Sequence, residues 1–147
     1  MKILVDADAC PVKEIIVNMA KRKDLPVLMI MDTSHEYNDG YSTTVTVDKA
    51  RDSADMALVN MVDSGDVVVT QDYGLAAMAL SKSAKVLNQN GLVYTNGNID
   101  QLLMDRHMGQ KIRRGGGRTK GPRKRTRDDD ARFIRSFESM LGQHISD

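Results

Sequence analysis

Cysteine, tryptophan and long apolar runs are scarce or absent in this sequence. A single cysteine among 147 residues excludes an intramolecular disulfide and any CxxC zinc pair, which together suit a reducing cytosol. No apolar stretch approaches the roughly 20 residues of a membrane span, and Asp6 lies where a signal peptide would need its apolar centre. We therefore expect one soluble, cytoplasmic domain with no membrane partner and a core that needs no covalent cross-link.

Aromatic residues and catalytic histidine motifs are also lacking. Aromatic side chains make up 4% of the sequence, so stacking on nucleic-acid bases is a weak prospect, with Tyr73 the best placed. The histidines His35, His107 and His144 form no HxxxH or HExxH motif, and there is no GxSxG elbow. We expect these histidines at the surface or in structural roles. Cys10 is expected to be a small buried residue rather than a reactive thiol.

The charged residues are segregated along the chain, which the formal net charge of +1 conceals. Residues 1–105 carry 9 Lys and Arg against 15 Asp and Glu, residues 106–127 carry 10 against 0, and residues 128–147 carry 2 against 5. An acidic body is thus followed by a basic segment. Such a segment attracts phosphate backbones without reading bases, although a solvated linker is the alternative. The expected nucleic-acid contacts are Arg113, Arg114, Arg118, Lys120, Arg123, Lys124 and Arg125.

Short apolar runs alternate with segments of helical periodicity. The expected strands are 3–5, 26–32, 43–47, 66–72 and 84–88, and the expected helices are 11–23, 51–62, 73–82 and 98–112, with a further helix near the C-terminus. Strands that alternate with helices at these lengths predict an α/β fold, in which a mainly parallel sheet carries helices on its faces.

The chain divides into three units by composition. They are residues 1–113 as the α/β core, 114–127 as a basic loop rich in Gly, Arg and Lys, and 128–147 as a C-terminal helix. The apolar stripe of this helix must be buried somewhere. Packing on the same domain is expected and a dimer contact is the alternative, so the protein is a monomer or a homodimer. The stripe consists of Phe133, Phe137, Met140 and Leu141.

Aspartates follow two of the predicted strands and begin a predicted helix. Asp6 and Asp8 end the first strand, where both carboxylates would point to the same side if the strand continued. Asp72 ends a later strand. Asp52 and Asp55 lie at i, i+3, so they share one helix face near the positive end of the helix dipole. Turns and helix caps are the plainer explanation for such aspartates.

These aspartates can converge at one edge of the sheet. In open α/β sheets, ligands bind beyond the carboxyl ends of the strands, where loops from neighbouring strands meet. Carboxylates brought together repel one another unless a cation lies among them, and hard oxygen ligands select Mg²⁺ or Mn²⁺ over metals that prefer sulfur. We therefore predict a metal site. Its expected ligands are Asp6, Asp8, Asp52, Asp55 and Asp72.

Three stretches together resemble a known family. The sequences LVDADACPVK, DSADMALVNMVDSGDVVVTQDYGLA and RRGGGRTKGPRKRT resemble the YaiI/YqxD family of small, largely uncharacterised bacterial proteins, which is similar to the PIN-like nuclease superfamily. The resemblance covers nearly the whole chain. It implies a three-layer PIN-like fold with a mainly parallel sheet and helices on both faces, followed by the basic loop and the C-terminal helix.

The resemblance also implies roles for particular acids. Asp6, Asp55 and Asp72 match the catalytic positions, and Thr70 supports the turn that carries the third acid. PIN-like nucleases often add a fourth acid soon after the third, yet the next one here is Asp100, far along the chain. Either Asp8 or another nearby acid, Asp52, substitutes for it, or the site holds one metal ion rather than two.

The function implied is a metal-dependent nuclease that hydrolyses RNA phosphodiester bonds, and the preference for RNA over DNA rests on the resemblance alone. A Mg²⁺ or Mn²⁺ ion held by carboxylates makes a bound water more acidic for in-line attack. Two other classes remain: a nucleic-acid-binding protein without catalysis, and a small-molecule phosphohydrolase. The last is suggested by D-x-D after the first strand, although Ala9 and Cys10 stand where haloacid-dehalogenase-type phosphatases usually have x-Thr or x-Val.

Overall fold

One sheet of six strands organises the part of the chain that the structure describes. The computed structural model describes residues 1–32, 37–48, 54–116 and 124–142. In order across the sheet, the strands are β3 (Thr43–Val47), β2 (Val27–Asp32), β1 (Ile3–Asp6), β4 (Val67–Val69), β5 (Lys85–Leu87) and β6 (Val93–Tyr94). Strands β1 to β5 are parallel, and β6 pairs with β5 in the antiparallel direction.

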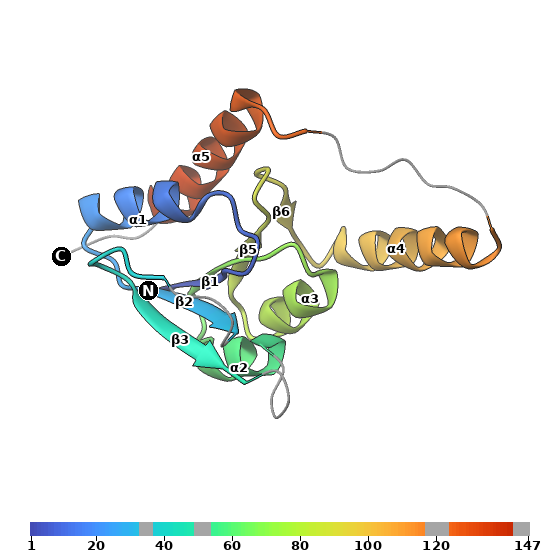
Figure 1. The fold of residues 1–147 in the computed structure, drawn as a ribbon, viewed down its shortest axis with the longest axis horizontal. Coiled ribbons are helices and arrows are strands. Elements are labelled where there is room, and N and C mark those ends of the chain that lie inside the picture. The colour runs from blue at the N-terminus through green and yellow to red at the C-terminus, as the bar shows by residue number, and fades with distance from the viewer. Residues whose placement is uncertain (33–36, 49–53, 117–123, 143–147) are drawn as a thin grey trace.

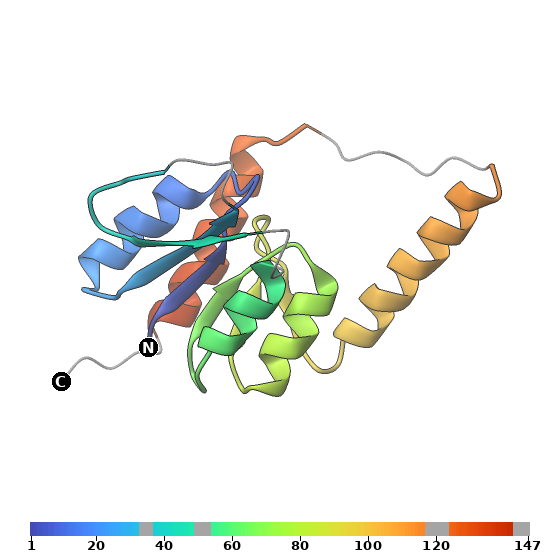
Figure 2. The same cartoon turned by 60° about the horizontal axis from the view of Figure 1, so that its bottom comes forward.

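Helices cover both faces of this sheet (Figures 1 and 2). They are α1 (Lys13–Arg22), α2 (Ala54–Met61), α3 (Tyr73–Ser81), α4 (Ile99–Arg114) and α5 (Arg127–Gly142). α1 and α5 pack on one face, and α2, α3 and the start of α4 pack on the other. This arrangement confirms the predicted α/β fold with three layers and a mainly parallel sheet.

Alternation along β1 sends its side chains to the two faces. Ile3 and Val5 join the apolar cluster under α1 and α5, whereas Leu4 joins the cluster under α2 and α3. All three are fully buried, as expected for a central strand covered on both sides. By the same alternation, Asp6 lies on the side of Leu4, facing α2 and α3.

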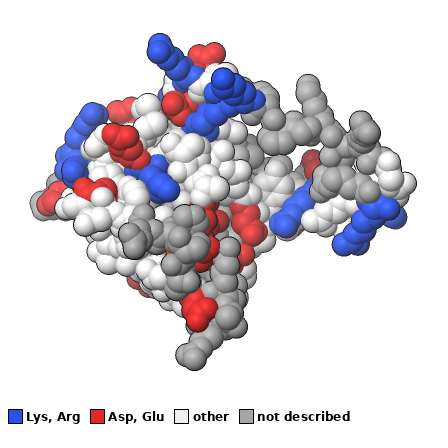
Figure 3. All heavy atoms as spheres, in the orientation of Figure 1, with Lys and Arg blue, Asp and Glu red and all other residues white. Residues whose placement is uncertain are grey.

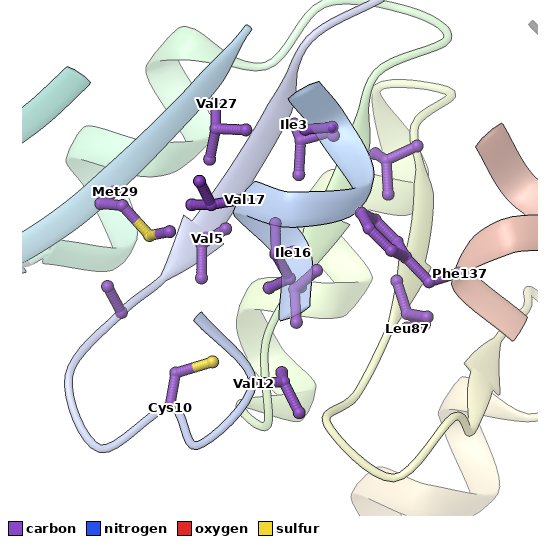
Figure 4. Close-up of a cluster of buried hydrophobic side chains, with 14 of the residues drawn as sticks. Ile3, Val5, Cys10, Val12, Ile16, Val17, Val27, Met29, Leu87 and Phe137 are labelled. Atoms are coloured by element: carbon purple, nitrogen blue, oxygen red, sulfur yellow. The ribbon is translucent and has the colours of Figure 1, made fainter. Parts of the chain in front are cut away.

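Helix α5 buries its apolar stripe in the same cluster as α1. Phe133 and Phe137 stack with ring centroids 5.2 Å apart, and both are fully buried. Figure 4 shows Phe137 beside Leu87 of β5. The C-terminal helix is therefore part of the domain core and does not offer its stripe to solvent.

Polar contacts join α5 and the residues just before it to the turn between β5 and β6. The Ser136 hydroxyl donates to the Gly91 carbonyl at 2.7 Å, and Nη2 of Arg125 donates to the Gln89 carbonyl at 2.9 Å. Gly91 has a φ of +87°, and a Cβ added there would lie 2.5 Å from the carbonyl oxygen of Arg132. Only glycine allows this close approach of turn and helix.

The apolar packing of helix α4 on the body comes from its first turns. Ile99 is buried, and Leu102 and Leu103 pack against the cluster that contains α3. Beyond these residues the helix extends away from the body of the molecule (Figures 1 and 2). The two 16-residue helices α4 and α5 therefore differ in how far they join the core.

The observed elements depart from the predicted ones at a few ends. β6 was not predicted, and the predicted strand over 66–72 shortens to three residues. α4 continues to Arg114, which is the first residue of the predicted basic loop. Across the described ranges, no helix has both the length and the apolar character that crossing a bilayer requires.

Candidate acidic site

The strand order creates a crevice between β1 and β4. β2 and β3 lie on one side of β1, and β4 and β5 lie on the other. In open α/β sheets, ligands bind outside the carboxyl ends of the two strands where the order diverges in this way. Asp6 is the last residue of β1, and Thr70 directly follows β4. The topology thus brings these two residues to the edge of the sheet that favours a ligand.

Thr70 connects two of the predicted acids. Its hydroxyl donates to Oδ2 of Asp6 at 2.9 Å and accepts from the backbone N–H of Asp72 at 3.0 Å. The Thr70 backbone N–H donates to the Leu87 carbonyl, and its carbonyl accepts from the Tyr94 hydroxyl at 3.2 Å. Thr70 is buried, so these bonds are shielded from competing water. One side chain thereby fixes the end of β1 relative to the turn after β4.

Asp72 forms the N-cap of α3. Its Oδ1 accepts from the backbone N–H of Leu75 at 3.1 Å, and Nη1 of Arg106 lies 3.8 Å from the same oxygen. The plainer explanation for this aspartate, helix capping, is therefore correct as far as it goes. The Asp72 carboxylate can still bind a further group, because a carboxylate has about four acceptor sites.

Asp55 comes from a third segment, the first turn of α2. Burial raises its pKa from 3.8 to about 6, helped by the charge of Asp72, a side-chain hydrogen bond with Asp72, and the charge of Asp6. Arg106 acts in the opposite direction. Asp55 is thus close enough to both other acids to compete with them for a proton.

Asp6 is affected by the same neighbours. Burial raises the pKa of Asp6, the hydrogen bond from Thr70 lowers it, and the charges of Asp72 and Asp8 raise it further. Figure 3 shows acidic side chains gathered in the middle of one face, with basic side chains on the neighbouring α4. The structure therefore brings the three predicted catalytic acids into one electrostatic environment.

Arg106 is the residue near this site that the sequence did not single out. It lies on α4, one turn after the partly buried Leu102 and Leu103, so it continues the face of the helix that meets the body. The sequence offered one signal for Arg106, namely a cation on the packed face of an amphipathic helix. It did not indicate the contact with Asp72, because the two residues are far apart along the chain.

Asp8 does not lie on the same strand as Asp6. β1 ends at Asp6, and the chain then turns through Ala9, whose φ is +59°. Oδ2 of Asp8 accepts from the backbone N–H of Asp32 at 3.2 Å, at the end of β2. The sequence predicted that the Asp6 and Asp8 carboxylates point to the same side only if the strand continued. The chain turns instead, so this prediction does not apply.

A pocket of about 230 Å³ opens beside Asp6 and Asp8. Its other lining residues include Cys10, and burial raises the pKa of this thiol. Figure 4 shows the Cys10 sulfur among the apolar side chains under α1. These observations agree with the expected structural role of Cys10, because a raised pKa disfavours the reactive thiolate.

Arg125, one of the predicted nucleic-acid contacts, is held within the protein. Its Nε donates to Oδ1 of Asp130 at 2.8 Å, and its Nη1 donates to Oδ1 of Asn90 at 2.7 Å. It also bonds the carbonyl of Gln89, which lines the pocket beside Asp6. The guanidinium is therefore a tether for α5 that carries positive charge to the edge of the acidic site.

Several other predicted residues have exposed side chains or lie outside the described residues. Arg114 and Lys124 are exposed, as is His107, and Arg113 lies in the last turn of α4. The predicted residues outside the described ranges are Asp52, Arg118, Lys120, Arg123, His35 and His144.

The donor set of the site suits a hard divalent cation. Asp6, Asp55 and Asp72 offer carboxylate oxygens only, and the raised pKa values of Asp6 and Asp55 reflect burial and crowded negative charge that a cation would relieve. Within the described ranges, no group of three or more His, Cys, Asp or Glu side chains is already spaced to hold a metal ion. Mg²⁺ does not require one, because it is commonly bound through one or two carboxylates and keeps several waters.

Comparison with known proteins identifies the family. The model of the uncharacterised YaiI/YqxD family matches residues 4–143, which is nearly the whole chain. The chain belongs to the YaiI/YqxD family. The matched residues include Asp6, Asp55 and Asp72. The family description states no activity, so the likeness to PIN-like nucleases stays a prediction.

Curated relatives of the YaiI/YqxD family match over similar lengths. A UPF0178 protein of Ruminiclostridium cellulolyticum is 68% identical over 93% of this chain and 90% of its own length. UPF0178 proteins of Alkaliphilus oremlandii and Exiguobacterium sibiricum are 53% and 50% identical, covering 99% and 96% of this chain and 94% and 96% of their own. No solved structure shows significant similarity to the chain.

Proposed function

We propose that this YaiI/YqxD protein is a nuclease that depends on Mg²⁺ or Mn²⁺ and hydrolyses phosphodiester bonds in RNA. The observation that supports the proposal most is the shared environment of Asp6, Asp55 and Asp72 at the carboxyl edge of the sheet. Three separate segments deliver these acids, and resemblance to PIN-like nucleases assigns catalytic roles to the same three. The preference for RNA rests on that resemblance.

In this proposal Asp6, Asp55 and Asp72 hold the cation. A bound divalent cation supplies an acidified water and stabilises charge on the phosphoryl oxygens. The chain itself holds these carboxylates in position. Thr70 sets Asp6 relative to Asp72, and the cap of α3 fixes the orientation of the Asp72 carboxylate.

Positive charge around the acids would draw in the phosphate backbone. Arg106 lies 3.8 Å from Asp72, and Arg125 lies beside the pocket that Asp6 lines. A separate groove of about 900 Å³ lies between the β5–β6 hairpin and α5, and its lining includes Lys85, Arg132 and Arg135 but no Asp or Glu. Such cations bind phosphates irrespective of sequence.

The decisive experiment measures metal binding and cleavage on the same samples. Calorimetry with Mn²⁺ would be run on the wild type and on Asp6→Asn and Asp72→Asn, together with degradation of a mixed single-stranded and structured RNA pool. We expect both variants to lose metal affinity and cleavage together, because each removes a carboxylate from one site. Asp24→Asn, an acid in the turn after α1 and away from this site, is the matched control and should behave as the wild type.

Other outcomes would reject the proposal. A wild type that binds RNA but cleaves nothing with any divalent metal would favour the second candidate, a nucleic-acid-binding protein without catalysis. The helix-capping role of Asp72 is the observation that favours this candidate. Hydrolysis of a chromogenic phosphomonoester that is lost in Asp6→Asn would instead favour a phosphohydrolase.

Two substitutions separate the role of the Thr70 hydroxyl from that of the side chain's bulk. Thr70→Val keeps the shape of the side chain but removes the hydroxyl that contacts both Asp6 and Asp72, whereas Thr70→Ser keeps the hydroxyl. We expect Thr70→Val to lose most Mn²⁺ affinity and Thr70→Ser to retain most of it. Equal affinities in the two variants would show that the hydroxyl does not organise the site.

Metal binding should also depend on pH in a defined direction. Because the pKa of Asp55 is raised to about 6, this carboxyl takes up a proton as the pH falls through that value. A protonated carboxyl is a poor ligand, so Mn²⁺ should raise the melting temperature more at about pH 7.5 than at about pH 5. Asp55→Asn should flatten this difference. A stabilisation by Mn²⁺ that grows on acidification would contradict the assignment of Asp55.

A further inference from the structure

Arg106 brings a positive charge to the edge of the acidic site. Its Nη1 lies 3.8 Å from Oδ1 of Asp72, and its charge opposes the rise in the pKa of Asp55. Asp72 caps α3 and Asp55 lies in the first turn of α2, so one guanidinium on α4 faces carboxylates of two other elements. The acids therefore have a cationic neighbour that the chain itself supplies.

The Arg106 guanidinium can leave this contact without a change in the fold. Its side chain is 49% exposed, and 3.8 Å is too long for a hydrogen bond. An ion pair of this kind contributes little to stability, and exposed side chains change rotamer within nanoseconds. The apolar contacts of α4 come from Leu102 and Leu103 in the preceding turn, so they hold the helix whichever way Arg106 points. The contact with Asp72 is therefore exchangeable.

Gly74 leaves space beside the same oxygen of Asp72. A Cβ added at Gly74 would lie 3.2 Å from Oδ1 of Asp72, which is a tight contact. Gly74 lies in the first turn of α3, and its φ is not positive. The backbone there accepts any L-residue, and alanine would favour the helix. The effect of glycine at this position is thus to keep Oδ1 accessible.

We propose that Arg106 is an exchangeable counter-ion, which pairs with Asp72 in the metal-free protein and with a phosphate of the RNA once a divalent cation is bound. This inference rests on the proposed function, because it takes the clustered acids as the ligands of the cation. A guanidinium and a divalent cation are attracted to the same carboxylates and repel each other, so each disfavours the other there. Arg106 therefore lowers the affinity of the site for metal.

The released guanidinium remains at the edge of the site, where it can bind a phosphate oxygen of the substrate. Arginine pairs with phosphate as it does with carboxylate, because both present oxygens to its planar fork of N–H donors. Arg106 thus exchanges one oxyanion for another. Loss of its charge should have opposite effects on the two ligands: the cation should bind more tightly and the RNA less tightly.

Calorimetry with Mn²⁺ in the absence of RNA tests the first half of the exchange. Arg106→Gln should bind Mn²⁺ about three- to tenfold more tightly than the wild type, a modest gain because the lost charge is exposed. Arg106→Lys keeps the charge and should bind as the wild type does. Lys111→Gln removes the same charge from an exposed position farther along α4, so it is the matched control and should leave the affinity unchanged.

Gly74→Ala tests whether the space beside Asp72 is needed. The added methyl group crowds Oδ1, so Mn²⁺ affinity should fall at least about threefold. Gly97→Ala is the control, because the Cβ added there would lie 3.6 Å from the Thr95 hydroxyl oxygen, an ordinary contact. Melting curves would verify that both variants are folded. Equal affinities in the two variants would overturn the role of this space in the exchange.

Cleavage of the RNA pool at saturating Mn²⁺ tests the second half of the exchange. Arg106→Gln should lose at least about fivefold in kcat/KM although it binds Mn²⁺ more tightly, and Arg106→Lys should retain most of it. A merely structural ion pair would not produce these opposite effects. Unchanged or weaker Mn²⁺ binding in Arg106→Gln, or unchanged cleavage, would overturn this inference and leave the proposed function standing. A wild type that binds no Mn²⁺ or cleaves no RNA would reject the proposed function, and the exchange with it.

Discussion

Helices α4 and α5 have the same length, yet α5 packs on the body over most of that length and α4 only over its first half. Both contain 16 residues with apolar side chains at helical spacing. α5 buries Phe133 and Phe137 completely, whereas α4 leaves Met104 and Met108 about half exposed. The comparison teaches that an apolar stripe predicts burial without specifying the partner that provides it.

What distinguishes the two helices is the set of contacts that hold each in place. α5 buries side chains from Phe133 to Leu141, and Ser136 within it and Arg125 just before it bond the β5–β6 turn. α4 has Ile99 at its beginning and Arg106 near its middle, and its later turns leave the body. We expect α5 to determine the stability of the domain and α4 to contribute little to it.

Removing α5 should have the largest effect. A chain that ends before residue 128 loses both core phenylalanines, and each buried Phe is worth about 3–5 kcal/mol against a total stability of about 5–15 kcal/mol. We expect a large drop in the melting temperature, measured by circular dichroism, or failure to fold. An unchanged melting temperature would show that α5 is dispensable and would remove the contrast with α4.

A single core substitution should reproduce much of that effect. Phe137→Ala should lower the free energy of unfolding by about 3–5 kcal/mol, because it leaves a cavity between α5 and the sheet. Urea denaturation measures this quantity. Ile134→Ala on the exposed side of the same helix is the control and should cost less than about 1 kcal/mol. Equal losses at the two positions would contradict the observed packing of α5.

The sequence predicted most of this fold because its strands and helices carry strong periodicity. The run that became β1 is apolar at Ile3, Leu4 and Val5, as a strand covered on both faces must be. β6 was missed because two residues carry no period that could be recognised. The exposure of α4 was also not predictable, because the periodicity of a helix gives its apolar face but not its neighbours.

The sequence likewise predicted some features of the candidate site and missed others. Asp6 and Asp72 were predicted from their places at strand ends, and parallel strands bring such ends to one edge. Their contact through Thr70 required β1 and β4 to be neighbours, which the sequence does not state. Arg106 was missed for a related reason, since its contact with Asp72 joins distant parts of the chain.

A glycine in the β5–β6 turn offers a sharper test of how α5 is docked. Gly91→Ala would place a Cβ 2.5 Å from the Arg132 carbonyl oxygen, at a φ of +87°. Gly65→Ala has the same φ and no atom within 4 Å of the added Cβ, so it measures the cost of the backbone alone, about 1–2 kcal/mol. We expect Gly91→Ala to cost a further 1–3 kcal/mol or so, because the crowding forces turn and helix apart. Equal costs in urea denaturation would show that the turn does not hold α5.

The smallest effect is expected on α4. Met108→Ala should change the free energy of unfolding of dilute protein by less than about 0.5 kcal/mol, because the side chain is half exposed and alanine favours the helix. A loss comparable to that of Phe137→Ala would mean that Met108 is packed against the body. α4 would then be buried in the same way as α5.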